Sequence, residues 1–220
     1  MTTTLKAVIF DLDGTLVDSL PLICESFRYV LQEYLPEQNH DYDRILGFVG
    51  RPLEDLMAEI SPDPEMAALL VTKYREHNRA ILKMVKVFPG IPQCLDQLQQ
   101  LGLRLAIVTS KNNLSTDMTM AAVNLGDDTF EHIIAKEDTT QHKPHPEPLL
   151  TVCDKMAVHP NTVAYVGDSV FDIECAHNAG AKALAALWGA HDPERVLAAQ
   201  PHQSAAAVTN LVDAIKTLNF

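Results

Sequence analysis

A short apolar run near the start of the chain, Ala7–Phe10, is followed at once by a cluster of acids. Four consecutive apolar residues are typical of a strand buried on both faces, as in a parallel sheet. Such a strand delivers the residues that follow it, Asp11 and Asp13, to the carboxyl edge of the sheet, where open α/β folds bind their ligands. Gly14 permits a tight turn directly afterwards.

The two carboxylates would repel each other at that edge. At ~4 Å and an effective dielectric constant of about 20, the repulsion is about 4 kcal/mol. A shared proton or a bound cation would offset it, and carboxylate oxygens suit a hard ion such as Mg²⁺. The alternative is an ordinary turn or helix cap, in which Asp and Gly are common.

Composition limits the partners of this chain. Its 220 residues suffice for one large domain or for a domain with an insertion. A formal net charge of −12 argues against a nucleic-acid or anionic-membrane surface, because both require clustered Lys and Arg. We find no leader-like segment and no membrane-length apolar run, and the four cysteines are widely spaced. We therefore expect a cytoplasmic protein with reduced thiols.

Strand-like and helical segments alternate in the second half of the chain, which favours a doubly wound parallel sheet. The expected strands are residues 6–10, 103–108, 133–135, 163–166 and 183–187. Between the first two of these strands, the sequence has a helical pattern throughout, and the first helix is expected to begin at a Ser19 cap. The apolar stripes of these helices need a surface to pack against. We predict an α/β core domain of residues 1–16 and 88–220, with an inserted α-helical domain of residues 17–87.

Polar residues suited to phosphate follow two further strands. Thr109 and Ser110 come directly after the segment 103–108, where hydroxyl and backbone N–H groups can bind phosphate oxygens. The alternative for Thr109 is a helix N-cap. Lys143 lies in a proline-rich segment that stiffens the chain, and its ammonium suits phosphate. The alternative is a solvated loop lysine.

Two acids follow the segment 163–166. Asp168 would lie beside the acids of the first strand if the strands are neighbours, completing an oxygen cage for Mg²⁺. Asp172, one helical turn further on, could hold a metal-bound water or Lys143. Helix capping and the helix dipole offer an alternative for both acids. Four such motifs in this order, each at the end of a strand, would be a poor coincidence.

A known superfamily combines the same motifs. The chain resembles the haloacid dehalogenase-like hydrolases in Asp11-x-Asp13-Gly14-Thr15, Thr109, Lys143 and Gly167-Asp168-Ser169-x-x-Asp172. The resemblance covers nearly the whole chain, and the inserted helices are similar to the first class of cap domain in that superfamily. A dehalogenase is disfavoured because that branch usually lacks the second acid, Asp13.

The resemblance implies a role for each motif. Asp11 would be the nucleophile that forms an aspartyl-phosphate, and Asp13 would protonate the leaving oxygen and later activate water. Mg²⁺ would be held by the Asp11 carboxylate, the Asp13 backbone carbonyl and Asp168. Thr109 and Lys143 would hold the phosphoryl oxygens. These roles agree with the needs of phosphoryl transfer, which are alignment and fixed positive charge.

Within the superfamily, the chain looks most like phosphoglycolate phosphatases and a related bacterial branch that hydrolyses pyrophosphate. The similarity rests on residues 10–19, 143–149 and 188–189, and the segments 47–53 and 74–78 resemble the pyrophosphatase branch in particular. This implies Mg²⁺-dependent hydrolysis of a small phosphate monoester through an aspartyl-phosphate, with inorganic pyrophosphate as the alternative substrate.

Two other functions are disfavoured. A β-phosphoglucomutase usually has Glu-Asp-Ser at 167–169 and lacks the acid at Asp172. A phosphate-binding scaffold without activity would be expected to have lost Asp11, Asp13 or a metal acid. Arg51 of the inserted helices is a candidate for the second anionic group of the substrate, with an ordinary surface arginine as the alternative.

Overall fold

The apolar run near the N-terminus forms β1 (Ala7–Phe10) in the interior of a parallel sheet. This computed structural model describes residues 4–37, 40, 42, 47, 49–125, 128–190 and 192–218. In them, six strands have the order β5-β4-β1-β6-β7-β8. β1 pairs with β4 (Arg104–Val108) on one side and with β6 (Val163–Gly167) on the other. The outer strands are β5 (His132–Ile134), β7 (Lys182–Ala186) and β8 (Gln203–Ala205).

The predicted doubly wound α/β fold is confirmed, and its six-stranded sheet has one strand more than expected. Five strands lie where apolar segments predicted them. β8 was not predicted, because it is three residues long and includes the polar Gln203 and Ser204. It pairs in parallel with β7, with Gln203 opposite Leu184.

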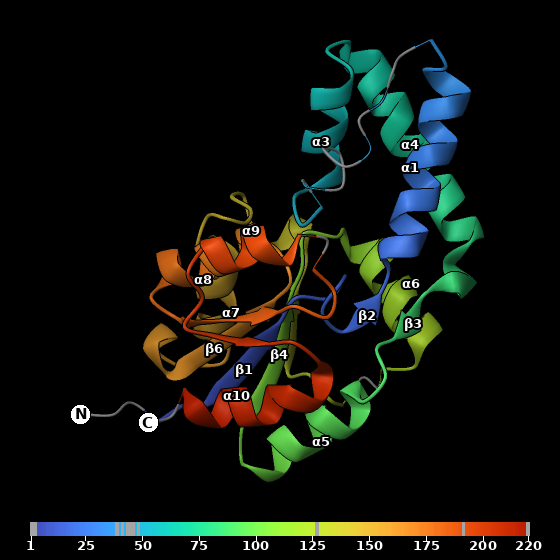
Figure 1. The fold of residues 1–220 in the computed structure, drawn as a ribbon. Helices are drawn as coiled ribbons and strands as arrows, with labels where there is room; N and C mark the ends of the chain where they lie inside the picture. The colour runs from blue at the N-terminus through green and yellow to red at the C-terminus, as the bar shows by residue number, and fades with distance from the viewer. Residues whose placement is uncertain are drawn as a thin grey trace.

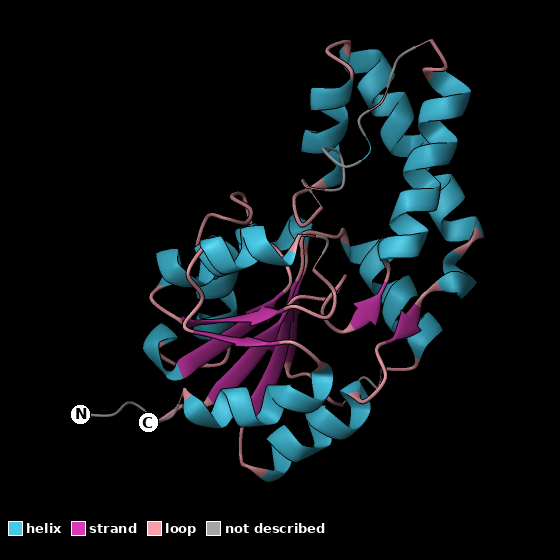
Figure 2. Ribbon diagram, in the orientation of Figure 1, coloured by secondary structure: helices cyan, strands magenta, loops and turns pink. Residues whose placement is uncertain are grey.

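Helices cover both faces of the sheet, as Figures 1 and 2 show. Successive side chains of each strand point to opposite faces, so each face has apolar residues for the helices to pack on. Val8 and Phe10 of β1 belong to one apolar cluster, together with residues of α5 (Ile91–Gln100) and α10 (Leu211–Thr217). Ala7 and Ile9 belong to the cluster on the other face. The helices there are α7 (Glu147–Lys155), α8 (Val170–Ala179) and α9 (Pro193–Ala198). Both faces of β1 are therefore buried, which explains its unbroken apolar sequence.

Three of the described helices form a cap that stands beyond the carboxyl edge of the sheet (Figure 1). They are α1 (Leu20–Tyr34), α3 (Leu53–Ile60) and α4 (Pro64–Ala80). Their apolar stripes meet in a separate cluster that includes Phe27, Met57 and Leu70. The helical cap inserted after the first strand is thus present, and its stripes bury against one another rather than against the sheet.

The chain passes between sheet and cap at two points, which lie side by side. β2 (Val17–Asp18) pairs antiparallel with β3 (Lys86–Val87), so the outgoing and returning segments form one ribbon. The expectation of a helical pattern throughout residues 17–87 is therefore wrong at its two ends. Ser19 follows at the N-cap position of α1, but its buried hydroxyl has no hydrogen-bond partner. Ser19 is therefore the N-cap residue of α1, as predicted, but its side chain makes no capping hydrogen bond.

The other described elements lie around this frame. α6 (Asn113–Val123) follows β4, and short 3-10 turns occur at Leu82–Met84, Lys136–Asp138, Pro160–Thr162 and Val208–Asn210. Of the cap segment 47–53, Phe48 lies outside the described residues. Among the residues that are described, no helix combines the length and apolarity needed to cross a bilayer.

Candidate active site

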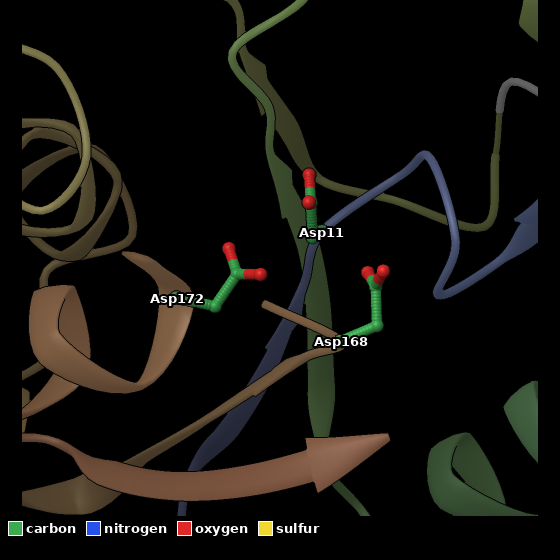
Figure 3. A group of neighbouring side chains, drawn as sticks. All are labelled: Asp11, Asp168 and Asp172. Carbon is green, nitrogen blue, oxygen red and sulfur yellow. The ribbon is translucent and has the colours of Figure 1, made fainter. Parts of the chain in front are cut away.

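Three acids from distant parts of the chain meet at the carboxyl edge of the sheet. Asp11 follows β1, Asp168 follows β6, and Asp172 lies in the first turn of α8. One carboxylate oxygen from each lies within 4.8 Å of the others. Figure 3 shows the three side chains around a common space. The expectation that Asp168 lies beside Asp11 depends on the pairing of β1 with β6, which the structure shows.

The turn after β1 fixes the position of Asp168. Gly14 has a φ of +79°, and a Cβ at this position would lie 2.2 Å from Oδ2 of Asp168. The next residue, Thr15, donates its hydroxyl to Oδ1 of Asp168 at 2.8 Å. Glycine is therefore required at position 14 both by the backbone conformation and by the close approach of the carboxylate.

Lys143 is buried between two carboxylates. Its Nζ lies 3.0 Å from Oδ2 of Asp11 and 2.7 Å from Oδ1 of Asp172, with 1% of the side chain exposed. Burial alone would lower the pKa of Lys143, but the charges of Asp11 and Asp172 outweigh it and raise the pKa. Lys143 is therefore a buried cation, and the alternative of a solvated loop lysine is wrong.

Asp172 holds Lys143 and also caps a helix. Its Oδ2 accepts hydrogen bonds from the backbone N–H and the hydroxyl of Ser169, at 3.0 and 2.6 Å. Its Oδ1 accepts one from the hydroxyl of Tyr165 at 3.0 Å as well as the bond from Lys143. Both interpretations of Asp172, as a capping residue and as a partner of Lys143, thus describe the same side chain. In the described part of the chain, each oxygen of Asp172 therefore has two partners, whereas Asp11 has one on each of its oxygens, so Asp172 is less suited to bind a metal directly.

Burial shapes the acidity of the other two carboxyls. The Asp11 side chain accepts the N–H of Leu12 at 2.7 Å. Burial raises the pKa of Asp11 to about 7, opposed by Lys143. The pKa of Asp168 is also raised, by burial first and then by the charges of Asp172 and Asp11. A cation placed between Asp11 and Asp168 would favour the ionised form of both.

The donor set and its charge fit a magnesium ion. When ionised, Asp11, Asp13, Asp168 and Asp172 carry four negative charges against two positive charges on Lys111 and Lys143, which leaves −2. A divalent ion would balance that charge, and Mg²⁺ prefers oxygen ligands of this kind. The residues present therefore fit the ion that the sequence predicted.

Asp13 and Lys111 form an ion pair that was not predicted. Lys111 Nζ lies 2.9 Å from Oδ1 and 2.8 Å from Oδ2 of Asp13, and both side chains are largely buried. The carboxylate of Asp13 is thus directed to Lys111, and it is not part of the three-acid cluster. Lys111 directly follows Thr109 and Ser110 at the end of β4, and that position was the available signal.

The two hydroxyl residues after β4 have different surroundings. Thr109 is buried, and its Oγ1 accepts the N–H of Lys111 at 3.2 Å. The N-cap of α6 is Asn112, so the helix-cap alternative for Thr109 is wrong. Ser110 donates its hydroxyl to the carbonyl of Gly50 in the cap at 2.6 Å. A phosphate-binding role for Ser110 stays a prediction.

A cavity of about 110 Å³ separates these residues from the cap. One water needs roughly 10–15 Å³ on this measure, so the space holds a small molecule. Its core side includes Asp11, Asp13, Thr109, Ser110, Lys111 and Asp168, and its cap side includes Phe27, Arg51, Glu54, Tyr74, Arg75 and Asn78. Arg51 thus lines the cavity, and its Nη1 lies 2.7 Å from Oε1 of Glu59.

The capped α/β fold and its acid-lined edge define an enzyme of the hydrolase class. The chain belongs to the haloacid dehalogenase-like hydrolases, and the model of that family matches residues 8–186. The predicted superfamily is therefore confirmed.

Curated relatives and solved structures agree with this assignment. Pyrophosphatase PpaX of Oceanobacillus iheyensis is 34% identical over 190 residues, which cover 86% of each chain. PpaX of Anoxybacillus flavithermus is 32% identical over 198 residues, 90% of each chain. A haloacid dehalogenase-like hydrolase structure from Bacteroides fragilis has a TM-score of 0.85 at 27% identity, covering 94% of this chain and 100% of the other. A Lactobacillus plantarum structure assigned as a phosphoglycolate phosphatase has a TM-score of 0.83 at 25% identity, covering 96% and 99%.

Proposed function

We propose that the protein is a Mg²⁺-dependent phosphatase that hydrolyses a small phosphate compound through an aspartyl-phosphate on Asp11. The buried contact between Asp11 and Lys143, beside the oxygens of Asp168, is the observation that carries this proposal. The relatives named pyrophosphatase favour inorganic pyrophosphate as the substrate. Phosphoglycolate is the second candidate, favoured by the structural similarity to a phosphoglycolate phosphatase.

Asp11 is suited to covalent catalysis by its position. It lies at the floor of the cavity, and the attack of its carboxylate on phosphorus would split one difficult displacement into two easier steps. Lys143 neutralises negative charge beside the attacking oxygen. The Asp11 carboxylate, the Asp13 backbone carbonyl and Asp168 would hold Mg²⁺. The ion supplies positive charge that lets an anionic nucleophile approach an anionic phosphate.

Asp13 would protonate the leaving oxygen and then activate the water that hydrolyses the aspartyl-phosphate. In the structure its carboxylate is paired with Lys111. Proton transfer therefore requires Asp13 to exchange this contact for the leaving oxygen of the substrate. Thr109, at the end of the neighbouring strand, would hold a phosphoryl oxygen.

We propose that residues 17–87 act as a cap domain over a core of residues 1–16 and 88–220. The cap would exclude water from the cavity, and Arg51 would bind the far end of the substrate. The protein would act in the cytoplasm, in keeping with its four free cysteines. Its partner would be a small phosphorylated metabolite or pyrophosphate rather than a nucleic acid or membrane, in keeping with the net charge of −12.

A substrate panel tests the proposal directly. The purified protein is assayed for phosphate release from pyrophosphate, phosphoglycolate and glucose 1-phosphate, with Mg²⁺ and with a chelator. We expect the highest kcat/KM on pyrophosphate and none without Mg²⁺. A preference for phosphoglycolate would select the second candidate. Absence of phosphate release from every compound would refute the phosphatase assignment.

A further inference from the structure

Three charged side chains connect the core to the cap beside the cavity. Lys136, which follows β5 in the core, has its Nζ 2.7 Å from Oε2 of Glu54 on α3. The other oxygen of Glu54, Oε1, accepts a hydrogen bond from Nη2 of Arg75 on α4 at 2.7 Å. Glu54 and Arg75 both line the cavity. A single carboxylate thus joins two helices of the cap to each other and to the core.

The charges of this group do not cancel. Glu54 provides one negative charge against the two positive charges of Arg75 and Lys136, so the group has a surplus of +1. Among the described residues, the other two cations that line the cavity each face one acid, Arg51 facing Glu59 and Lys111 facing Asp13. The surplus charge marks the place on the cap side where an anion is most favoured.

Glu54 also fixes the orientation of Arg75. Burial raises the pKa of Glu54, but Lys136 and Arg75 outweigh it and hold the pKa below its usual value, so the carboxylate stays ionised. A guanidinium presents five N–H donors in a planar fork, and the bond to Glu54 engages one of its two terminal nitrogens. Such a fork matches the oxygens of a phosphate or carboxylate.

Building on the proposed function, in which Arg51 also faces the far end of the substrate, we infer that Arg75 is a specificity-determining residue that binds the distal anionic group of the substrate. Glu54 and Lys136 are positioning residues that hold the guanidinium toward the cavity. Lys136 belongs to the core, so its contact orients Arg75 when the cap lies over the reacting phosphate. The favoured substrates are small phosphate compounds with a second anionic group, such as pyrophosphate or a carboxylate-bearing ester, rather than monoesters with a neutral tail.

Two substrates that differ at the far end test this inference. Steady-state kinetics of wild type and Arg75→Gln are measured on pyrophosphate and on p-nitrophenyl phosphate, whose leaving group has no second anion. We expect Arg75→Gln to raise KM for pyrophosphate roughly tenfold, equivalent to about 1.4 kcal/mol, and to change kcat/KM for the aryl ester less than about twofold. Arg75→Lys should recover part of the loss, because it keeps the charge without the fork.

Three further variants separate positioning from general structure. Lys136→Gln should raise KM for pyrophosphate by about two- to fivefold, as expected for a partly exposed ion pair, and spare the aryl ester. Glu54→Gln should also raise KM for pyrophosphate, because Arg75 loses the carboxylate that orients it. The loss of one negative charge alone would predict the opposite, a tighter binding of pyrophosphate. Arg28→Gln, which breaks an exposed cap pair with Glu25, is the matched control and should change neither substrate.

The outcomes distinguish this inference from the proposed function. An active wild type whose Arg75→Gln variant has an unchanged KM for pyrophosphate, or loses both substrates equally, would overturn the role of Arg75 and leave the phosphatase standing. If Arg75→Gln does not fold, Arg75→Lys and Lys136→Gln test the inference in its place. An unchanged KM for pyrophosphate in both, or an equal loss on both substrates, would overturn it. If the wild type is inactive on every compound, calorimetric titration of pyrophosphate into wild type and Arg75→Lys decides instead, and equal affinity would overturn the inference.

Discussion

The ammonium of Lys143 lies 2.7 Å from the carboxylate of Asp172, a residue 29 positions further along the chain, and neither side chain is more than 1% exposed. A buried ion pair of this kind adds little stability by comparison with an apolar pair, but breaking it leaves an uncompensated charge. Because the same ammonium also contacts Asp11, the residue that neutralises the nucleophile is part of the folded core.

Replacing Lys143 by Met should therefore cost stability as well as activity. The variant leaves Asp11 and Asp172 buried without their cation, and we expect the free energy of unfolding to fall by about 3–5 kcal/mol. Urea denaturation without metal measures it. Tyr165→Phe, which removes a hydroxyl that contacts Asp172 and the carbonyl of Val108, is the control and should cost less, about 1.5–3 kcal/mol. A Lys143→Met protein as stable as wild type would contradict the view of a buried, mutually dependent cluster.

Asp11→Asn should abolish turnover and leave the protein folded. The amide keeps the size of the side chain but cannot attack phosphorus, so kcat should fall at least about a thousandfold. Circular dichroism and a melting curve establish that the variant is folded. Asp213→Asn, whose side chain is 84% exposed, should retain full activity. Substantial turnover by Asp11→Asn would remove Asp11 as the nucleophile.

Magnesium should stabilise the protein in proportion to its binding. A ligand at 100 times its Kd adds about 2.7 kcal/mol to the free energy of unfolding, so Tm should rise with Mg²⁺ concentration. The chelated protein should be inactive and recover when Mg²⁺ is restored. Asp168→Asn should lose both the rise in Tm and the activity. An unchanged Tm in wild type at saturating Mg²⁺ would argue against a metal site at the three-acid cluster.

Gly50 should be needed for the fit of the cap against the core. Its φ is +109°, and a Cβ here would lie 2.8 Å from Oγ of Ser169, which is held by its bond to Asp172. We expect Gly50→Ala to displace the loop and raise KM severalfold. Gly102→Ala is the control, because φ is +79° but nothing lies within 4 Å. It should cost about 1 kcal/mol of stability without changing KM. Equal kinetics in the two variants would show that the contact with Ser169 is unimportant.

His202 should make stability depend on pH. Its Nδ1 accepts the backbone N–H of Ala183 at 3.1 Å, which requires a neutral nitrogen. Burial first, and then the charges of Lys182 and His177, lower the pKa of His202 in the folded protein. The unfolded chain therefore binds this proton at a higher pH than the folded chain, so stability should fall as pH drops below about 6.5.

Urea denaturation of wild type and His202→Asn between pH 5.5 and 7.5 gives the free energy of unfolding of each protein as a function of pH. The difference between the two slopes is the contribution of His202. The variant should show a weaker dependence on pH. Histidines far from residue 202 contribute equally to both proteins, whereas His177, whose ring centroid lies 5.1 Å from that of His202, belongs to the difference as well. Parallel pH profiles would mean that His202 titrates alike in the folded and unfolded states.

The sequence predicted those features that depend on local pattern and strand order. An apolar run marks a buried strand, and the end of such a strand marks the edge of the sheet, so Asp11, Thr109 and Asp168 could be assigned to one place from the residue pattern alone. β8 was not predicted, because a strand of three residues with two polar side chains has no apolar pattern. The missing hydrogen bond of the Ser19 hydroxyl could not be predicted, because a serine favours the N-cap position without determining whether its side chain bonds there.

Contacts between sheet and cap could not be predicted, because they depend on where the cap rests. The bond from Ser110 to the carbonyl of Gly50 joins residues 60 positions apart, and the ion pair between Lys136 and Glu54 likewise joins the core to a distant part of the chain. Neither has a local sequence pattern. Lys111 stood beside a recognised motif, but its pairing with Asp13 follows from side-chain reach across the edge of the sheet rather than from spacing.

The ribbon formed by β2 and β3 brings the entry and exit of the cap next to each other, with Val17 opposite Val87. A module joined through two adjacent strands can be exchanged without altering strand order or the pairing of β1 with its neighbours. A different cap could thus be inserted at this junction, by evolution or by design, so that the unchanged α/β core acts on substrates with other leaving groups.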